Sequence, residues 1–148
     1  MNSLFNRNFN VDIKEKDSYT YRLDVTMKDI YHDFLLTLDV ETSEFIIENV
    51  KLKLNKKPKE ECEELKTLVK KMEGVRISQG FTKSVTSTLG GSKGCPNLVN
   101  LFLISAPLAL NVNATVDKKN ENLTKEELEI LLSDVLGGVC LAYPVKEE

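Results

Sequence analysis

Two cysteines, Cys62 and Cys95, are the residues of this chain best suited to chemistry, because each is expected at the start of a helix. Cys95 follows the glycine-rich loop 90–94 and precedes Pro96, a residue favoured in the first turn of a helix. Unpaired backbone N–H groups and the helix dipole favour a thiolate there, and Lys93 adds positive charge. Cys95 is therefore a candidate nucleophile, redox thiol or metal ligand. The alternative is that Cys95 packs as a small apolar residue against the helix that follows.

Cys62 lies in the first turn of a helix that Pro58 is expected to open. The same electrostatic argument applies to its thiol. Cys62 also shares an apolar stripe with Leu65, Val69 and Met72, which recur at spacings of three and four residues. A cysteine on such a stripe is often a plain core residue, so packing is the stronger alternative for this thiol than for Cys95.

His32, the single histidine, and Asp33 stand together at the start of a predicted strand, where their side chains point to opposite faces. Thiolates combined with an imidazole or a carboxylate suit zinc, ferrous iron or an iron–sulfur cluster. The sequence has no Cys-x-x-Cys pair, so the fold would have to assemble such a site. We therefore predict a metal site whose ligands are His32, Asp33, Cys62 and Cys95.

The elements that must position these residues follow from hydrophobic periodicity. Alternating apolar and polar residues predict strands at 19–28, 32–40 and 45–54, with Ile46, Glu48 and Val50 on one face of the last. Short links between them indicate an antiparallel meander of three or more strands. Helical spacing then predicts helices from Pro58 to Gly74, at 81–89, from Pro96 to Pro107, and from a capping box at Thr124 and Glu127 to Leu136. The third of these helices carries Leu98, Leu101, Phe102 and Ser105 on one side.

This order of elements predicts an α+β fold with helices packed on one face of the sheet. We expect residues 1–18 to form an N-terminal edge segment and residues 19–148 a single domain. The strand at 19–28 could pair with a second copy of the chain, which makes a homodimer one expectation.

Charge and composition exclude several partners. The 148 residues carry 20 basic and 23 acidic side chains in mixed order, which gives a net charge of -3. This distribution creates no positive electrostatic potential that would attract nucleic acid. No uninterrupted apolar run reaches the roughly 18 residues of a membrane span. The first ten residues lack the apolar core of a signal peptide. Three cysteines, with Cys140 expected to pack in a core, indicate reduced thiols in the cytoplasm.

The stretch from Arg22 to about Leu110 resembles a bacterial family that is known as a domain of unknown function. The family pattern has a strand beginning His-Asp, a proline followed by a cysteine, and a glycine-rich turn leading to Gly-Cys-Thr-His-Leu. The matching residues here are His32-Asp33, Pro58 with Cys62, and the run Gly94-Cys95-Pro96-Asn97-Leu98. The Thr-His of the family is Pro96-Asn97 in this chain, so one potential ligand or base is absent.

The same order is similar, more distantly, to the NifU-type iron–sulfur scaffold. Asp33, Cys62 and Cys95 match three places of that motif, and His32 is nearest to its first cysteine. The resemblance implies a NifU/SufE-like sheet with helices on one side. It also implies that the separated residues converge at one edge of the sheet to hold a cluster.

Three hypotheses follow. The chain handles zinc or an iron–sulfur cluster through the four predicted ligands, and this is the hypothesis that the resemblances favour. It is a thiol enzyme or redox protein in which Cys95 attacks. Or it is a non-catalytic module that binds a protein partner, with both cysteines in the core. The first and the third hypotheses require no catalysis.

Overall fold

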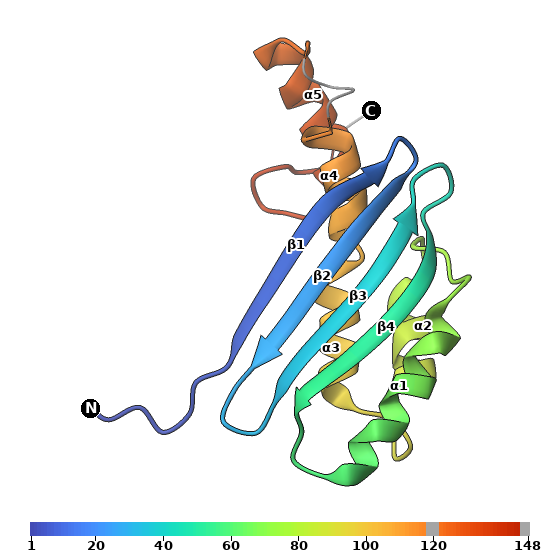
Figure 1. The fold of residues 1–148 in the computed structure, drawn as a ribbon. Helices are drawn as coiled ribbons and strands as arrows, with labels where there is room; N and C mark the ends of the chain where they lie inside the picture. Colours follow the sequence, from blue (N-terminus) through green and yellow to red (C-terminus); the bar gives the residue numbers. More distant parts are fainter. Residues whose placement is uncertain (118–121, 146–148) are drawn as a thin grey trace. The chain divides into compact units, whose positions relative to one another are not determined.

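The computed structural model describes residues 1–117 and 122–145 of the chain. The chain divides into two compact units, Met1–Pro107 and Leu108–Glu148. The single domain expected from residue 19 onward stays a prediction. The first unit holds an antiparallel sheet and helices, which confirms the predicted α+β class (Figure 1).

The sheet of the first unit is a four-stranded antiparallel meander in the order β1-β2-β3-β4. Three strands match the predicted ones: β2 (Thr20–Lys28), β3 (Asp33–Glu41) and β4 (Ile46–Lys56). The fourth, β1 (Asn8–Asp17), occupies most of the predicted N-terminal edge segment and pairs along β2. Its side chains are mostly exposed, because it forms the outer edge of the sheet.

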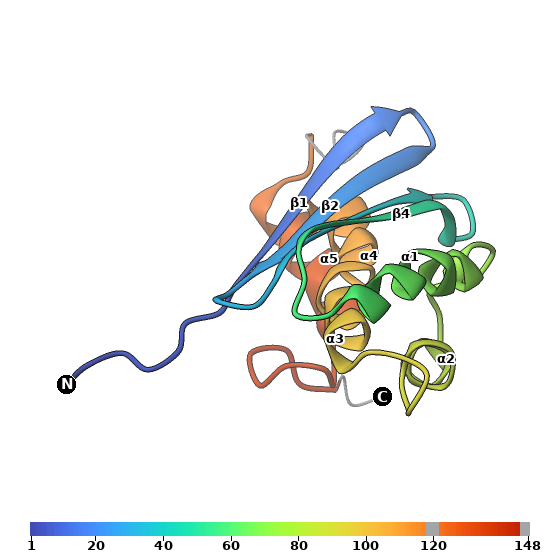
Figure 2. The same cartoon turned by 60° about the horizontal axis from the view of Figure 1, so that its bottom comes forward.

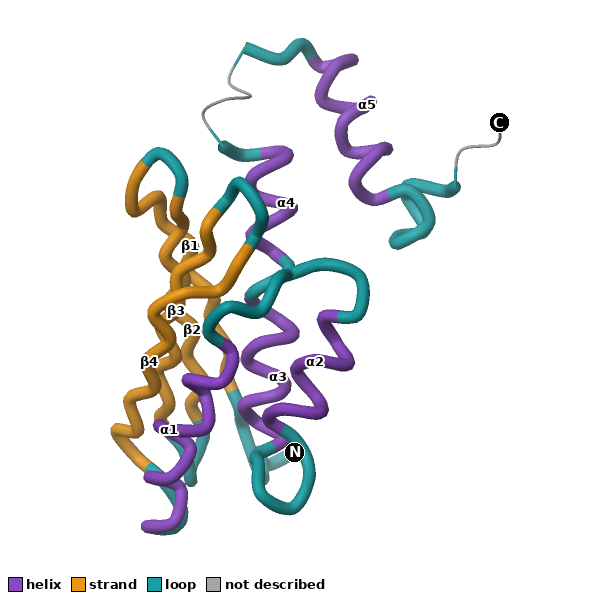
Figure 3. The backbone as a smooth tube through the Cα atoms, turned by 90° about the vertical axis from the view of Figure 1, so that its right-hand side faces the viewer, coloured by secondary structure: helices purple, strands orange, loops and turns teal. Residues whose placement is uncertain are grey.

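Helical segments cover one face of this sheet, as the sequence predicts (Figures 2 and 3). The strands β2 and β3 alternate buried and half-exposed residues, so every second side chain points into the core. The segments are η1 (Glu60–Glu64), α1 (Leu65–Leu68), η2 (Val69–Met72), α2 (Phe81–Leu89) and α3 (Pro96–Ser105), where η denotes a 3₁₀ helix.

The helix that Pro58 was expected to open begins at Glu60 instead and forms as three short pieces, η1, α1 and η2. Cys62 therefore lies in a 3₁₀ turn and not in the first turn of an α-helix. Its apolar stripe is confirmed, because Leu65, Val69 and Met72 are buried. In α3 the agreement extends to single residues: the predicted inward-facing side chains Leu98, Leu101, Phe102 and Ser105 are all fully buried. Burial of each large apolar side chain contributes about 1.5–3 kcal/mol, so these two segments are firmly docked on the sheet.

A β-bulge in β4 corrects the predicted face of that strand. The register against β3 shifts between Thr37 and Asp39, and Asn49 adopts a left-handed backbone with φ of 50°. Ile47 is therefore fully buried and Glu48 is exposed, although the plain alternation placed Ile46 and Glu48 together with Val50. Asparagine tolerates this conformation better than most residues, and strict period-two reasoning cannot foresee the extra residue.

Asn49, the residue at the bulge, also donates a hydrogen bond to a buried carboxylate. The Asn49 amide donates to Asp39, whose side chain is fully buried and also accepts from Arg22 and Lys16. Burial raises the pKa of Asp39, but these donors outweigh it and lower the pKa to about 2. Asp39 is therefore charged, and it links β3 to β1, β2 and β4 through Lys16, Arg22 and Asn49.

The second unit contains α4 (Leu108–Thr115) and α5 (Lys125–Leu136). The predicted cap of α5 is confirmed, since the Glu127 backbone N–H donates to the Thr124 hydroxyl at 3.1 Å. Among the described residues, one helical stretch, Pro96–Thr115, is long and apolar enough to cross a membrane by length and composition alone. Buried helices of soluble proteins pass the same test, and a third of this stretch is buried.

Candidate functional site

Cys62 and Cys95 line one pocket, although they come from separate elements of the chain. The pocket has a volume of about 270 Å³. Both cysteines are free, and each is half-buried. The remaining lining residues of this thiol pocket are Glu61, Glu64, Leu65, Ser92, Lys93 and Gly94.

The backbone of Cys95 is held between α2 and α3. Its N–H donates to the Leu89 carbonyl at 2.8 Å, and its own carbonyl accepts from Leu98 at 3.1 Å as α3 begins. Cys95 is the N-cap of α3, and Pro96 occupies the first turn as predicted. The preceding Gly94 must lack a side chain, since a Cβ there would lie 1.9 Å from the Leu89 oxygen. These constraints fix the position of the Cys95 backbone.

Cys62 is held by the 3₁₀ turn η1. Its N–H donates to the Lys59 carbonyl at 3.2 Å, and its carbonyl accepts from the Leu65 N–H at the start of α1. The buried side chain of Leu65 anchors this turn against the core. Glu61 and Glu64 line the same pocket as Cys62. The thiol pocket therefore combines two thiols, two carboxylates and the amine of Lys93.

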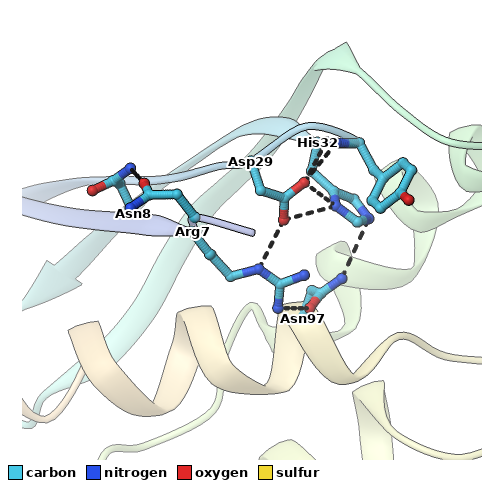
Figure 4. Close-up of polar contacts among 7 residues, drawn as sticks. Arg7, Asn8, Asp29, His32 and Asn97 are labelled. Atoms are coloured by element: carbon cyan, nitrogen blue, oxygen red, sulfur yellow. Dashed lines mark hydrogen bonds and ion pairs between the residues drawn. The ribbon is translucent and has the colours of Figure 1, made fainter. Parts of the chain in front are cut away.

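His32 lies in a different cluster, built around Asp29 in the turn between β2 and β3 (Figure 4). The Asp29 carboxylate is fully buried and accepts from His32 Nδ1 at 2.9 Å and from Arg7 Nε at 2.8 Å. The backbone N–H groups of Tyr31 and His32 donate to the same carboxylate, at 2.7 and 2.9 Å. Asp29 thus gathers four donors, three from the turn and one from Arg7.

Asn97 closes this cluster into a ring. Its carbonyl oxygen accepts from Arg7 Nη1 at 3.0 Å, and its amide nitrogen lies 3.5 Å from His32 Nε2. With the proton on Nδ1, the imidazole donates to Asp29 and accepts from Asn97, so both ring nitrogens have partners. We call Arg7, Asp29, His32 and Asn97 the Asp29 ring. It ties the N-terminal segment, the β2–β3 turn and the first turn of α3 together.

The electrostatics of the ring favour a charged carboxylate. Burial raises the pKa of Asp29, but the hydrogen bonds from His32, Tyr31 and Arg7 outweigh it and hold the pKa well below its usual range. Arg7 Nε and Nη1, both carboxylate oxygens of Asp29 and both ring nitrogens of His32 have partners within the ring. The ring is therefore built for stability, and it leaves His32 no open nitrogen.

The predicted ligands consequently fall in different places. Cys62 and Cys95 share the thiol pocket, whereas His32 belongs to the Asp29 ring and Asp33 starts β3 opposite Lys28 and Lys56. Within residues 1–117 and 122–145, no three His, Cys, Asp or Glu side chains are placed together to hold a metal ion. Two thiols do not supply the four ligands of an iron–sulfur cluster. Metal binding through this set of residues stays a prediction.

Sequence reasoning missed most of the Asp29 ring. One local signal existed, because an aspartate that accepts from the backbone two residues later is a common turn. Nothing local connects Arg7 with Asn97, which lie far apart in the chain. Cys140, which we expected to pack in a core, is exposed in the second unit.

The comparisons with known proteins concern the part of the chain that carries both clusters. Residues 6–111, most of the chain, match the family described as "Protein of unknown function (DUF2889)". No curated protein matches the chain. No solved structure matches it either, so the resemblance to the NifU-type fold is not confirmed. The family match contains the whole sheet, the helices that cover it and both cysteines of the thiol pocket. The chain therefore belongs to the DUF2889 family of proteins of unknown function.

Proposed function

We propose that this protein is a thiol–disulfide redox protein in which Cys62 and Cys95 work as a pair. One observation carries the proposal: the two thiols, contributed by separate elements, line the same pocket and are both free and half-exposed. Buried structural cysteines are inert, whereas reactive ones lie in accessible sites with positive charge nearby. Cys95 meets this description best, because it caps α3 and lines the pocket with Lys93.

The chemistry is a two-electron exchange. The Cys95 thiolate attacks one sulfur of a substrate disulfide, forms a mixed disulfide, and releases the other half as a thiolate that takes up a proton. The Cys62 thiolate then attacks the Cys95 sulfur and releases the second half as a thiol. Two electrons and two protons pass to the substrate, and the protein is left with a Cys62–Cys95 disulfide.

The test uses the full chain with Cys140→Ser, which removes the exposed third thiol. We expect an excess of hydroxyethyl disulfide to convert both thiols into one intramolecular disulfide. Mass spectrometry after alkylation and proteolysis detects this product. Cys62→Ser should stop at a mixed disulfide on Cys95. Two independent mixed disulfides, or two thiols that react only after denaturation, would refute the proposal.

Zinc binding is the second candidate, favoured by the donor types of the thiol pocket. Thiolate sulfur and carboxylate oxygen are both zinc ligands, and Cys62, Cys95, Glu61 and Glu64 all line the pocket. Among the described residues no three such side chains are already grouped for a metal, so zinc would have to draw these four together. Calorimetric titration of the reduced protein with zinc tests this candidate. It requires about one equivalent of zinc in the Cys140→Ser protein and loss of binding in both Cys62→Ser and Cys95→Ser. Equal binding in the two variants would eliminate it. Parallel titration of His32→Ala and Asp33→Ala tests the wider predicted ligand set.

A further inference from the structure

A second pocket adjoins the thiol pocket. It has a volume of about 410 Å³ and is lined by Glu64, Thr67, Leu68, Lys71 and Lys93. Glu64 and Lys93 line both pockets, so the two form one groove between the η1–α1 segment and the loop before α3. Sites for small molecules commonly measure about 300–1,000 Å³. The groove is therefore large enough for a ligand that extends beyond a single disulfide.

The two ends of the groove differ in charge. Glu61 lines only the thiol pocket, and Lys71 lines only the second pocket. Within the part of the chain that the structure describes, Lys71 and Lys93 form no ion pair. Their neighbours Lys57, Lys66 and Lys70 are paired with glutamates. Glu64 and Lys93 are common to both pockets, so Glu61 gives the thiol pocket an excess of negative charge and Lys71 gives the second pocket an excess of positive charge. The first end attracts an ammonium group and the second attracts a carboxylate.

We infer that the substrate is a small zwitterionic disulfide of the amino-acid or short-peptide class. Its sulfurs lie at Cys95, an ammonium group lies near Glu61 and Glu64, and a carboxylate lies between Lys71 and Lys93. The uncharged side chains of Leu65 and Leu68 line the groove beside the connecting carbons. This inference rests on the proposed thiol exchange and adds the class of molecule that is exchanged.

The test compares three oxidants of different charge on the reduced Cys140→Ser chain: oxidised glutathione, neutral hydroxyethyl disulfide and cationic cystamine. Stopped-flow measurement gives the second-order rate of thiol loss for each oxidant at low and high salt. We expect oxidised glutathione to react faster than either of the others, with an advantage that shrinks at high salt.

Lys71→Ala is the decisive variant, because Lys71 lines the second pocket without touching the thiol pocket. It should reduce the rate ratio of oxidised glutathione to hydroxyethyl disulfide about two- to fivefold, the range of an exposed ion pair. Lys70→Ala is the matched control, since Lys70 pairs with Glu73 and lines neither pocket.

The outcomes separate the two proposals. If hydroxyethyl disulfide forms the Cys62–Cys95 disulfide but the rate ratio is equal in Lys71→Ala and Lys70→Ala, the substrate class is wrong and the redox function stands. If no oxidant links Cys62 to Cys95, the redox function fails and this inference fails with it. A cystamine rate above that of oxidised glutathione would also overturn the inference.

Discussion

The Asp29 ring and the thiol pocket both use the start of α3, yet they are opposite kinds of site. Asn97 of that helix closes the ring, and Cys95, its N-cap, lines the pocket. In the ring four donors meet one fully buried carboxylate. In the pocket two half-exposed thiols face open space. Polar groups that satisfy one another stabilise a fold, whereas accessible nucleophiles remain available for chemistry.

This contrast reassigns the single histidine. The sequence made His32 a candidate metal ligand, but in the structure its two ring nitrogens face Asp29 and Asn97. The comparison therefore predicts that substitutions in the ring change stability, and that substitutions in the pocket change reactivity.

The largest effect is expected from Asp29→Ala. The change leaves Arg7, His32 and two backbone N–H groups without their shared acceptor, and the loss of one partner of a buried pair costs about 3–5 kcal/mol. Urea unfolding measures the free energy of unfolding. Asp12→Ala is the control, because the exposed pair of Asp12 with Lys14 should contribute less than about 1 kcal/mol. Similar losses in the two variants would contradict the structural role of the ring.

An intermediate effect is expected from pH. The folded-state pKa of Asp29 lies below its unfolded value, so its ionised form adds stability above about pH 4, and that stability is lost as the pH falls toward the folded-state pKa. Asp29→Asn has no such titration. The gap in unfolding free energy between the natural protein and this variant should be widest at neutral pH and narrow below pH 4. Asp39, whose pKa is lowered to about 2, titrates in both proteins, so its contribution cancels in the difference between their unfolding free energies. A gap that stays constant from pH 7 to pH 2 would argue against a charged Asp29.

The smallest effect on stability is expected from the thiols. Cys62→Ser and Cys95→Ser should each lower the unfolding free energy by less than about 1 kcal/mol, since both side chains are half-exposed. Leu101→Ala, a fully buried position of α3, should cost about 2–5 kcal/mol in the same urea titration and shows that the measurement responds to core changes. Losses at the cysteines as large as at Leu101 would mean that the thiols belong to the core.

Parts of the fold were predictable because their signals are local. Alternation in β2 and β3 placed the buried faces correctly, and the spacing of Leu98, Leu101 and Phe102 identified the inner face of α3. The bulge at Asn49 was not predictable, since the extra residue depends on the partner strand and on the buried Asp39. The strand β1 was expected only as an edge segment, although Phe9, Val11 and Ile13 alternate with polar residues at the period of a strand. That alternation indicates a strand but does not say which strand it pairs with.

The sequence by itself determined the helix start at Cys95, the meander and the apolar stripes that dock the helices. These features depend on neighbours a few residues apart. Only the tertiary structure decided that the two cysteines share a pocket and that His32 is committed to Asp29. The physical reason is that packing helices on a sheet brings together residues far apart in the chain, such as Arg7 and Asn97. No local pattern records which of them will meet.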